Sequence, residues 1–204
     1  MISIQMAQKL LGTLSRGLLF ILSAPAGTGK TTLVRELTKE FACVEQNVSW
    51  TTRALRAGEE AGVDYHFLSV AEFEAQVKAG QFLEHAKNFG AYYGSHKGTV
   101  EKKLEQGKHL FLVIDTEGAR QVKAVMPAIS IFVKPPSMAE LRRRLEERRT
   151  ETPEMIEARL ARVQIELDAA NEYNYQITND RFEAAYQILR SICIAEEHRT
   201  RLRS

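Results

Sequence analysis

The sequence predicts an α/β fold with a parallel central sheet, and three features support this prediction. Continuous apolar runs at residues 18–22, 109–114 and 129–133 have the character of strands buried on both faces. Segments with apolar residues at helical spacing separate these runs. The first run leads through a glycine-rich turn into such a segment. Strands that alternate with helices in both halves of the chain predict a layered α/β core.

Length and composition suit a globular protein with one core. The chain has 204 residues, of which 44% are apolar and 26% are charged, which fits one compact domain or a core with small insertions. The net charge is +2, so no global field indicates a nucleic-acid or membrane partner. Cys43 and Cys193 show no metal-ligand spacing, which favours buried thiols in a reducing compartment.

The N-terminus has no charged segment followed by an apolar core and a small-residue cleavage site. No apolar run is long enough to span a bilayer. We therefore expect a cytoplasmic protein without a membrane partner, and nothing in the sequence indicates an obligate protein partner.

Local patterns predict the elements of the first third of the chain. Apolar residues at helical spacing predict a short lead-in helix within residues 1–17 and a longer helix over 30–41. A β-branched stretch predicts a strand at 47–52. The charged, glycine-punctuated segment 53–64 predicts an exposed loop, and a strand is expected at 65–70.

The next segment is rich in short strands. A helix is expected over 70–79, where a glycine follows as a helix stop. Two strands, 81–86 and 88–93, flank a glycine turn, and a short helix is expected over 99–105. Residues 49–99 thus interrupt the strand–helix alternation like an inserted subdomain.

The second half returns to alternation. The strand 129–133 ends at two prolines, and the following helix begins near Ser137, with Glu140 three residues later as in a capping box. The remaining elements are a helix over 153–167, a strand at 175–178 and a helix over 182–197.

The turn after the first strand has the residues of a phosphate-binding loop. Strand, glycine-rich turn and helix N-terminus together let backbone N–H groups surround an anion. In such a loop Lys30 can reach the β/γ-phosphates of a nucleoside triphosphate, and the Thr31 hydroxyl can ligate Mg²⁺. The alternative is a connecting loop with incidental glycines. The predicted triphosphate-binding residues are Ser23, Ala24, Pro25, Ala26, Gly27, Thr28, Gly29, Lys30, Thr31 and Thr32.

Charged residues elsewhere complete a candidate site. Asp115 ends the second apolar run, at the strand edge where α/β sheets bind ligands, and can hold Mg²⁺ through water; the alternative is a helix-capping aspartate. Arg144, Arg148 and Arg159 are candidates for stabilising transferred phosphate, because guanidinium binds phosphate oxygens in pairs. The alternative is a solvated basic face, which we expect for Arg142, Arg143 and Arg149.

A second anion site is possible in the inserted segment. Arg53 and Arg56 lie three residues apart in a glycine-bearing loop and could hold a phosphate, and Tyr65 and Tyr93 could complete the site through their hydroxyls. Exposed arginines in loops are common, so the residue types alone leave the alternative open.

Taken in order, the motifs resemble those of the guanylate kinases. These are SAPAGTGKTTL, TTRALRAGE, DYHFLS, FLEHA, YYGS, VIDTEG, PPS, RRRLEERRTET and ITND, and the resemblance covers residues 16–195. It implies a P-loop NTPase core (16–48, 100–136 and 171–204), a small GMP-binding subdomain (49–99) and a helical lid (137–170).

The resemblance also implies roles for residues that match the family motifs. Arg53, Arg56, Tyr65 and Tyr93 would hold the GMP phosphate. Ser49, Glu84 and Ser95 would read guanine, with Asp115 nearby, and Asn179 would contact the ATP side. The implied catalytic residues are Lys30, Arg53, Arg144, Arg148 and Arg159, and Mg²⁺ would lie near Thr31 and Asp115.

The implied activity is Mg²⁺-dependent phosphoryl transfer from ATP to GMP, and to dGMP. Four positions depart from the commonest pattern, namely Ala24, Trp50, Val113 and Arg149. Val113 stands where the family often has aspartate, so Asp115 would serve Mg²⁺ alone. Two other readings remain, a related module that binds peptides without turnover and a kinase for another nucleotide.

Overall fold

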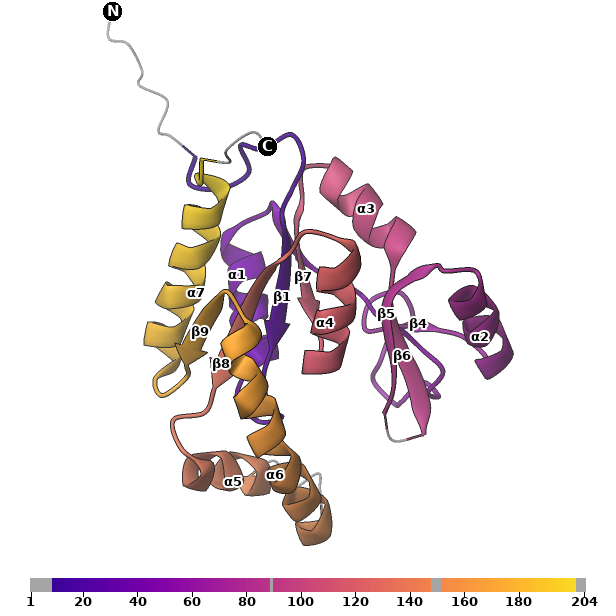
Figure 1. Cartoon of the computed structure of the whole chain (residues 1–204), viewed down its shortest axis with the longest axis vertical. Helices are drawn as coiled ribbons and strands as arrows, with labels where there is room; N and C mark the ends of the chain where they lie inside the picture. Colours follow the sequence, from indigo (N-terminus) through magenta and orange to yellow (C-terminus); the bar gives the residue numbers. More distant parts are fainter. Residues whose placement is uncertain (1–8, 89, 148–151, 201–204) are drawn as a thin grey trace, which may run out of the picture.

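The structure is a computed structural model that describes residues 9–88, 90–147 and 152–200. Its centre is a five-stranded sheet in which every neighbouring pair is parallel, as the sequence predicted. The strand order is β2 (Val44–Gln46), β7 (His109–Val113), β1 (Leu19–Ser23), β8 (Ile129–Lys134) and β9 (Tyr175–Thr178). Because β1 lies in the middle, the loop that follows it emerges at the centre of the carboxyl edge (Figure 1).

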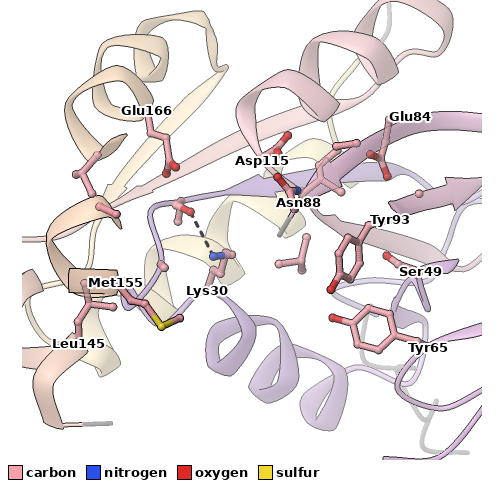
Figure 2. A pocket seen from close by; sticks show the side chains of 18 residues that line it. Lys30, Ser49, Tyr65, Glu84, Asn88, Tyr93, Asp115, Leu145, Met155 and Glu166 are labelled. Carbon is pink, nitrogen blue, oxygen red and sulfur yellow. Dashed lines mark hydrogen bonds between the residues drawn. The ribbon is translucent and has the colours of Figure 1, made fainter. Parts of the chain in front are cut away.

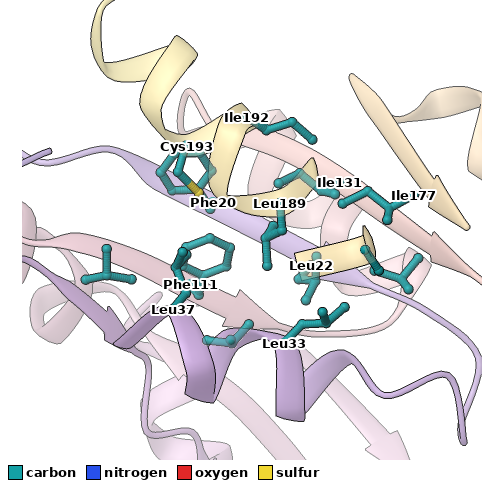
Figure 3. Close-up of a cluster of buried hydrophobic side chains, with 14 of the residues drawn as sticks. Phe20, Leu22, Leu33, Leu37, Phe111, Ile131, Ile177, Leu189, Ile192 and Cys193 are labelled. Atoms are coloured by element: carbon teal, nitrogen blue, oxygen red, sulfur yellow. The ribbon is translucent and has the colours of Figure 1, made fainter. Parts of the chain in front are cut away.

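One face of this sheet is covered by α1 (Lys30–Glu40) and α7 (Phe182–Glu197). Alternate residues of β1 point to this face, and Figure 3 shows the cluster that they form with both helices. The buried members include Phe20, Leu22, Leu33, Leu37, Phe111, Ile131, Ile177, Leu189 and Cys193. The buried thiol of Cys193 agrees with the sequence prediction, and burial raises its pKa.

The opposite face packs against α3 (Lys97–Glu105) and α4 (Thr116–Val125). The other residues of β1, Leu19 and Ile21, join this cluster together with Leu104 of α3 and Val122 of α4. Helices on both faces make the three-layer arrangement that the alternation of elements predicted.

A second, four-stranded sheet stands beside the core (Figure 1). It consists of β4 (His66–Phe67), β3 (Trp50–Thr51), β6 (Ala91–His96) and β5 (Phe82–Asn88), and α2 (Val70–Lys78) packs on it. A complete capping box begins α2, in which Ser69 and Glu72 exchange side-chain and backbone hydrogen bonds. The ring of Phe73 is fully buried and stacks on Phe82 with centroids 4.4 Å apart.

Two helices, α5 (Met138–Glu147) and α6 (Pro153–Asp168), form a third unit below the central sheet in Figure 1. They pack on each other through Leu141, Leu145, Ile156, Leu160 and Val163. Ser137 caps α5 as predicted, because its hydroxyl accepts from the Glu140 backbone N–H at 3.1 Å. The Glu140 carboxylate binds Arg143 and Arg144.

Three expectations were incomplete or wrong. The sequence reading missed α4, because its buried side chains, Ala119 and Val122, are few and small and its first turn contains a glycine, and it missed the three-residue edge strand β2. The lead-in helix is wrong for residues 9–17, which have no helix. There Gly12 adopts φ +83°, and the N–H groups of Gly12 and Thr13 donate to Glu197 instead of forming a helical turn.

The predicted strands at 47–52 and 65–70 are present only as the short strands β3 and β4, each two residues long. No helix in the described ranges is long and apolar enough to cross a bilayer.

Candidate active site

A pocket of about 550 Å³ lies at the carboxyl edge of the central sheet, and all three units contribute to its wall (Figure 2). Ala24, Ala26 and Lys30 come from the loop after β1 and from α1. Ser49, Tyr65, Glu84, Asn88 and Tyr93 come from the small sheet and its loops. Leu145, Met155 and Glu166 come from α5 and α6, and Val113 and Asp115 from the end of β7. Residues far apart in sequence therefore meet in one cavity.

The loop after β1 has the backbone of an anion cradle. Gly27 and Gly29 adopt φ of +87° and +84°, a left-handed conformation that suits glycine, and α1 begins at the next residue. The Thr28 hydroxyl donates to the Pro25 carbonyl at 2.9 Å and braces the turn. The positive end of the α1 dipole thus faces the cavity side of the loop, an arrangement that favours phosphate.

Lys30 is the cation of this loop and lines the pocket. Its Nζ donates to the Ala24 carbonyl at 3.2 Å, so the ammonium lies along the loop (Figure 2). Ala24, the departure from the commonest glycine, is 8% exposed and packs in the core cluster. Thr31 and Thr32 follow in the first turn of α1, where Thr31 is exposed.

Asn179 supports the loop from behind. Its side-chain amide donates to the Thr28 carbonyl at 2.7 Å, and a side chain added at Gly29 would lie 2.9 Å from the same amide. Its own carbonyl accepts from Arg144 Nη1 at 3.1 Å. Asn179 therefore joins the loop to α5, as a brace that holds the backbone of the loop in place.

Glu84 is a buried carboxylate on β5, with 5% of its surface exposed. Burial raises its pKa to about 7, the charge of Asp115 adds to the rise, and hydrogen bonds from Ser95 oppose it. Ser95 lies opposite Glu84 in the β5–β6 pairing and is fully buried. The buried carboxylate faces the same cavity as Ser49 (Figure 2).

Asp115 is the helix-capping aspartate that the sequence analysis left as an alternative, and it also lies at the pocket. Its carboxylate accepts from the Gly118 backbone N–H at 2.8 Å and caps α4. It also lines the pocket. A carboxylate has two oxygens and several lone pairs, so the cap leaves capacity for further contacts.

Arg53 is held by Glu59, a partner that the sequence analysis did not assign. Its guanidinium forms a two-pronged contact with Glu59, at 3.0 and 2.8 Å, and lies 5.2 Å from the Tyr65 ring centroid. Glu59 also accepts from the Arg56 backbone N–H at 3.0 Å. The hydrogen bonds that Arg53 donates to Glu59 raise the pKa of Arg53 above its ordinary value, so the guanidinium keeps its charge.

Tyr65 and Tyr93 stand edge to face beside this arginine, with ring centroids 5.9 Å apart. Both hydroxyls point into the pocket (Figure 2). Burial raises the pKa of Tyr65, so its hydroxyl stays a hydrogen-bond donor at neutral pH. The Arg56 side chain is exposed in the neighbouring loop.

The comparisons with known proteins agree with this geometry. The sequence profile of the guanylate kinase family matches residues 16–196. The chain belongs to the guanylate kinase family. Guanylate kinase from Protochlamydia amoebophila is 53% identical over 184 residues, which cover 90% of this chain and 93% of that protein. Guanylate kinase from Chlamydia trachomatis serovar D is 48% identical over 182 residues, 89% of each chain.

A solved structure supports the same assignment at the level of the fold. The crystal structure of guanylate kinase from Anaplasma phagocytophilum matches with a TM-score of 0.73 and 34% sequence identity. The match covers 94% of this chain and 91% of that one. Family and fold therefore identify an enzyme of the nucleoside monophosphate kinase class.

The arginines of α5 and α6 divide into two groups. Arg142 and Arg143 are on the exposed face of α5, in ion pairs with Glu157, Glu140 and Glu147, which confirms the solvated face predicted for them. Arg144 is more buried and bonds Glu140 at 2.7 Å as well as Asn179. Arg148 and Arg149 lie outside the described residues, as does the side chain of Arg159 on α6.

The sequence analysis missed several residues of the site. Leu145 and Met155 resembled ordinary helix-core positions, and Asn88 and Glu166 resembled surface positions. Glu59 belongs to the quoted TTRALRAGE motif, and its spacing of six residues from Arg53 across a turn was a usable signal.

Proposed function

We propose that this protein transfers the γ-phosphate of ATP to GMP, with Mg²⁺, giving ADP and GDP, and that it also accepts dGMP. The observation that carries the proposal is one cavity lined by the P-loop lysine Lys30 and by the buried acceptor Glu84. A donor site and a base-reading site that share a pocket suit transfer between two bound nucleotides.

At the acceptor end, Glu84 would read guanine. Ionised, it accepts the N1–H and the N2 amino donors of the base together, and adenine offers neither. Ser49 lines the pocket nearby and would contribute a hydroxyl. Arg53, Tyr65 and Tyr93, with Arg56 from the adjoining loop, would hold the GMP phosphate.

At the donor end, the loop from Ser23 to Thr32 would cradle the ATP phosphates, and Asn179 would keep the loop in shape. Lys30 would neutralise charge on the β- and γ-phosphates. Arg144, Arg148 and Arg159, in the unit formed by residues 137–170, would stabilise the transferred group as its charge redistributes. This assignment divides the chain into a core, a GMP-binding subdomain over 49–99 and a lid.

The phosphoryl transfer itself does not require general acid–base catalysis. A GMP phosphate oxygen attacks the γ-phosphorus in line, a P–O bond forms there, and the bond to the ADP oxygen breaks. A monophosphate is largely ionised at neutral pH, so no general base is required. The residues supply alignment, charge and exclusion of water, which otherwise hydrolyses ATP.

The oxygen donors near the loop fit Mg²⁺. The Thr31 hydroxyl and the Asp115 carboxylate are hard ligands of the kind Mg²⁺ prefers, alongside phosphate oxygens and water. Among the described residues no group of three or more His, Cys, Asp or Glu could hold a metal, and Mg²⁺ in nucleotide sites commonly uses only one or two protein ligands. When bound, it supplies positive charge to the phosphate oxygens.

One assay tests the proposal against both alternatives. ADP formation is measured with ATP and each of the four nucleoside monophosphates, with Mg²⁺ and with a chelator. We expect turnover with GMP and dGMP that depends on Mg²⁺. Faster turnover with AMP, CMP or UMP would indicate a kinase for another nucleotide, and nucleotide binding without ADP formation would indicate a binding module.

A further inference from the structure

Asn47 is a buried polar residue at the junction between the two sheets. It follows β2, and its backbone N–H donates to the Phe111 carbonyl of β7 at 2.9 Å, so its main chain continues the central sheet. Its side chain reaches the small sheet, where Nδ2 donates to the Ser95 hydroxyl oxygen at 3.2 Å. The two residues are 8% and 0% exposed. This contact is therefore a water-excluded polar link between the units.

Ser95 in turn lies beside Glu84. It lies directly opposite Glu84 in the β5–β6 pairing, so the two side chains stand on the same face of the small sheet, and the Ser95 hydroxyl and backbone N–H both lower the pKa of the Glu84 carboxylate. A hydroxyl has one proton and two lone pairs. Because the Asn47 amide occupies a lone pair of the Ser95 oxygen, the single proton is left for the carboxylate. Asn47, Ser95 and Glu84 form a chain that runs in one direction from donor to acceptor.

The direction of this chain changes the role expected for Ser95. From sequence, its hydroxyl was expected to contact guanine directly. In the structure this hydroxyl accepts from Asn47, Ser95 lies opposite Glu84 in the β5–β6 pairing, and Ser95 is not among the residues that line the pocket. A chain of hydrogen bonds in a low-dielectric interior strengthens each member and fixes the orientation of the last one.

We propose that Asn47 is a positioning residue for base recognition, whose amide directs the Ser95 proton to Glu84 and so fixes the orientation in which that carboxylate meets guanine. The inference rests on the proposed role of Glu84 as the guanine reader. Asn47 is hydrogen-bonded to the central sheet through its backbone and to the small sheet through its side chain. It therefore positions the guanine-reading carboxylate relative to the sheet that carries the P-loop.

Other groups near Glu84 also influence its titration, and the test must distinguish their effects from that of Asn47. From β6 the contact is Ser95, and from α4, which packs against β5, the groups are Asp115 and the uncharged Gly118. Asp115 is unchanged in every variant below, so its charge is constant. A changed acid limb in the pH profile of kcat/KM for GMP then reports on the hydrogen-bond chain from Asn47 through Ser95 to Glu84.

The main variant is Asn47→Asp, which keeps the size of the side chain. Its carboxylate accepts the Ser95 proton instead of donating, and it adds negative charge near Glu84. We expect KM for GMP to rise by on the order of tenfold, as for the loss of a buried charged hydrogen bond. kcat and KM for ATP should change little, and the acid limb of kcat/KM for GMP should move to higher pH, because added negative charge favours the protonated Glu84.

Asn47→Ala serves as the second variant and removes the amide without adding charge. It should raise KM for GMP with a smaller shift of the acid limb. Asn174→Ala is the matched control, because Asn174 forms a similar asparagine–serine pair with Ser130 at 2.9 Å, away from the residues that line the pocket. Thermal unfolding of each variant identifies losses of stability that a merely structural role would cause.

A double-variant cycle with Glu84→Gln decides the matter. If Asn47 acts through Glu84, its substitutions should have little further effect on KM for GMP in the Glu84→Gln background. Equal effects in both backgrounds, or an unchanged KM and acid limb in Asn47→Asp and Asn47→Ala, would overturn the inference while leaving the proposed function intact. If Glu84→Gln alone leaves GMP recognition unchanged, the guanine-reading role fails, and the inference fails with it.

Discussion

At the scale of single residues, the proposed guanine-reading role of Glu84 predicts that use of GMP depends on pH. Burial raises its pKa to about 7. Only the ionised carboxylate can accept both donors of guanine. As pH falls below about 7, its ionised fraction drops by roughly tenfold per pH unit, so we expect kcat/KM for GMP to fall in parallel. Above that pH the efficiency should reach a plateau. Steady-state kinetics from about pH 5.5 to about pH 8 check this.

GMP also gains a phosphate proton near pH ~6, so the Glu84→Gln variant is the control. At the plateau it should lose roughly 10- to 100-fold in kcat/KM for GMP, because an amide offers one acceptor oxygen and turns an NH₂ group toward a donor. Its acid limb should lie at the phosphate pKa alone. An acid limb at the same pH in both proteins would show that Glu84 does not titrate in recognition.

The proposed place of Lys30 in the donor site predicts that a change there affects the donor and spares GMP binding. Lys30→Met keeps a similar length but removes the charge that neutralises the β- and γ-phosphates. We expect phosphoryl transfer to fall by on the order of a thousandfold or more, while calorimetric titration still detects GMP. Near-normal turnover in the purified variant would exclude the P-loop assignment, and loss of GMP binding would place Lys30 on the acceptor side.

The sequence located the pocket residues that the family motifs contain, among them Lys30, Ser49, Tyr65, Glu84 and Tyr93. What it could not supply was the direction of hydrogen bonds. Residue type alone does not reveal that the Ser95 hydroxyl faces Glu84 or that Asn179 braces the loop. These facts depend on contacts between distant segments, such as the 48-residue separation of Asn47 and Ser95.

At the scale of elements, α5 packs directly on the P-loop. A side chain added at Gly27 would lie 3.1 Å from Leu145 Cδ2 and 3.2 Å from Leu141 Cδ1, at a φ of +87°. Gly27→Ala therefore adds crowding against α5 to a backbone strain of about 1–2 kcal/mol. We expect a raised KM for ATP and a lowered kcat, because the loop can relieve the crowding only by leaving its cradle shape.

Gly90→Ala is the matched control for that strain. Gly90 has a φ of +84° in the turn between β5 and β6, and a side chain there meets open space. Both variants should lose similar free energy of unfolding in chemical denaturation, but only Gly27→Ala should lose activity. If both variants kept the wild-type KM for ATP, the packing of α5 would have no part in shaping the loop.

Element prediction failed where tertiary contacts supply the stabilisation. The helix α4 has only Ala119 and Val122 as buried side-chain anchors, together with the cap from Asp115. These few anchors stabilise the helix only when it packs against β1 and β5. Long apolar strands such as β1 and β7 need no such context, which is why the sequence identified them directly.

At the scale of the whole molecule, one buried cluster joins three distant segments at the amino edge of the central sheet, opposite the pocket. Glu197 near the end of α7 accepts from the Gly12 and Thr13 backbone N–H groups and from His109 Nε2 at the start of β7, the last at 2.5 Å. The Leu18 N–H donates to His109 Nδ1 at 3.0 Å, so the ring proton lies on Nε2. Every one of these contacts spans more than 80 residues.

This cluster predicts how stability responds to acid. Burial alone raises the pKa of Glu197, but the hydrogen bonds from Thr13, Gly12 and His109 outweigh it and hold the pKa at about 2. Since this lies below the ordinary value of 4.5, the ionised group stabilises the folded protein above pH ~4.5. The contribution, about 3 kcal/mol, is lost as pH falls from ~4.5 toward ~2.

Glu197→Gln tests this, because the amide keeps the size of the side chain but turns an NH₂ group toward donors that need an acceptor. Urea unfolding at neutral pH should show a loss of about 2–3 kcal/mol, and stability should then change less with acid than in the wild type. Glu196→Gln is the control, since the Glu196 carboxylate lies one residue away and bonds Tyr175 and Arg199 instead.

The activity of folded Glu197→Gln should equal that of the wild type, because the cluster lies at the edge opposite the pocket. An unchanged urea midpoint, or a lost activity at full stability, would refute the separation of this cluster from catalysis.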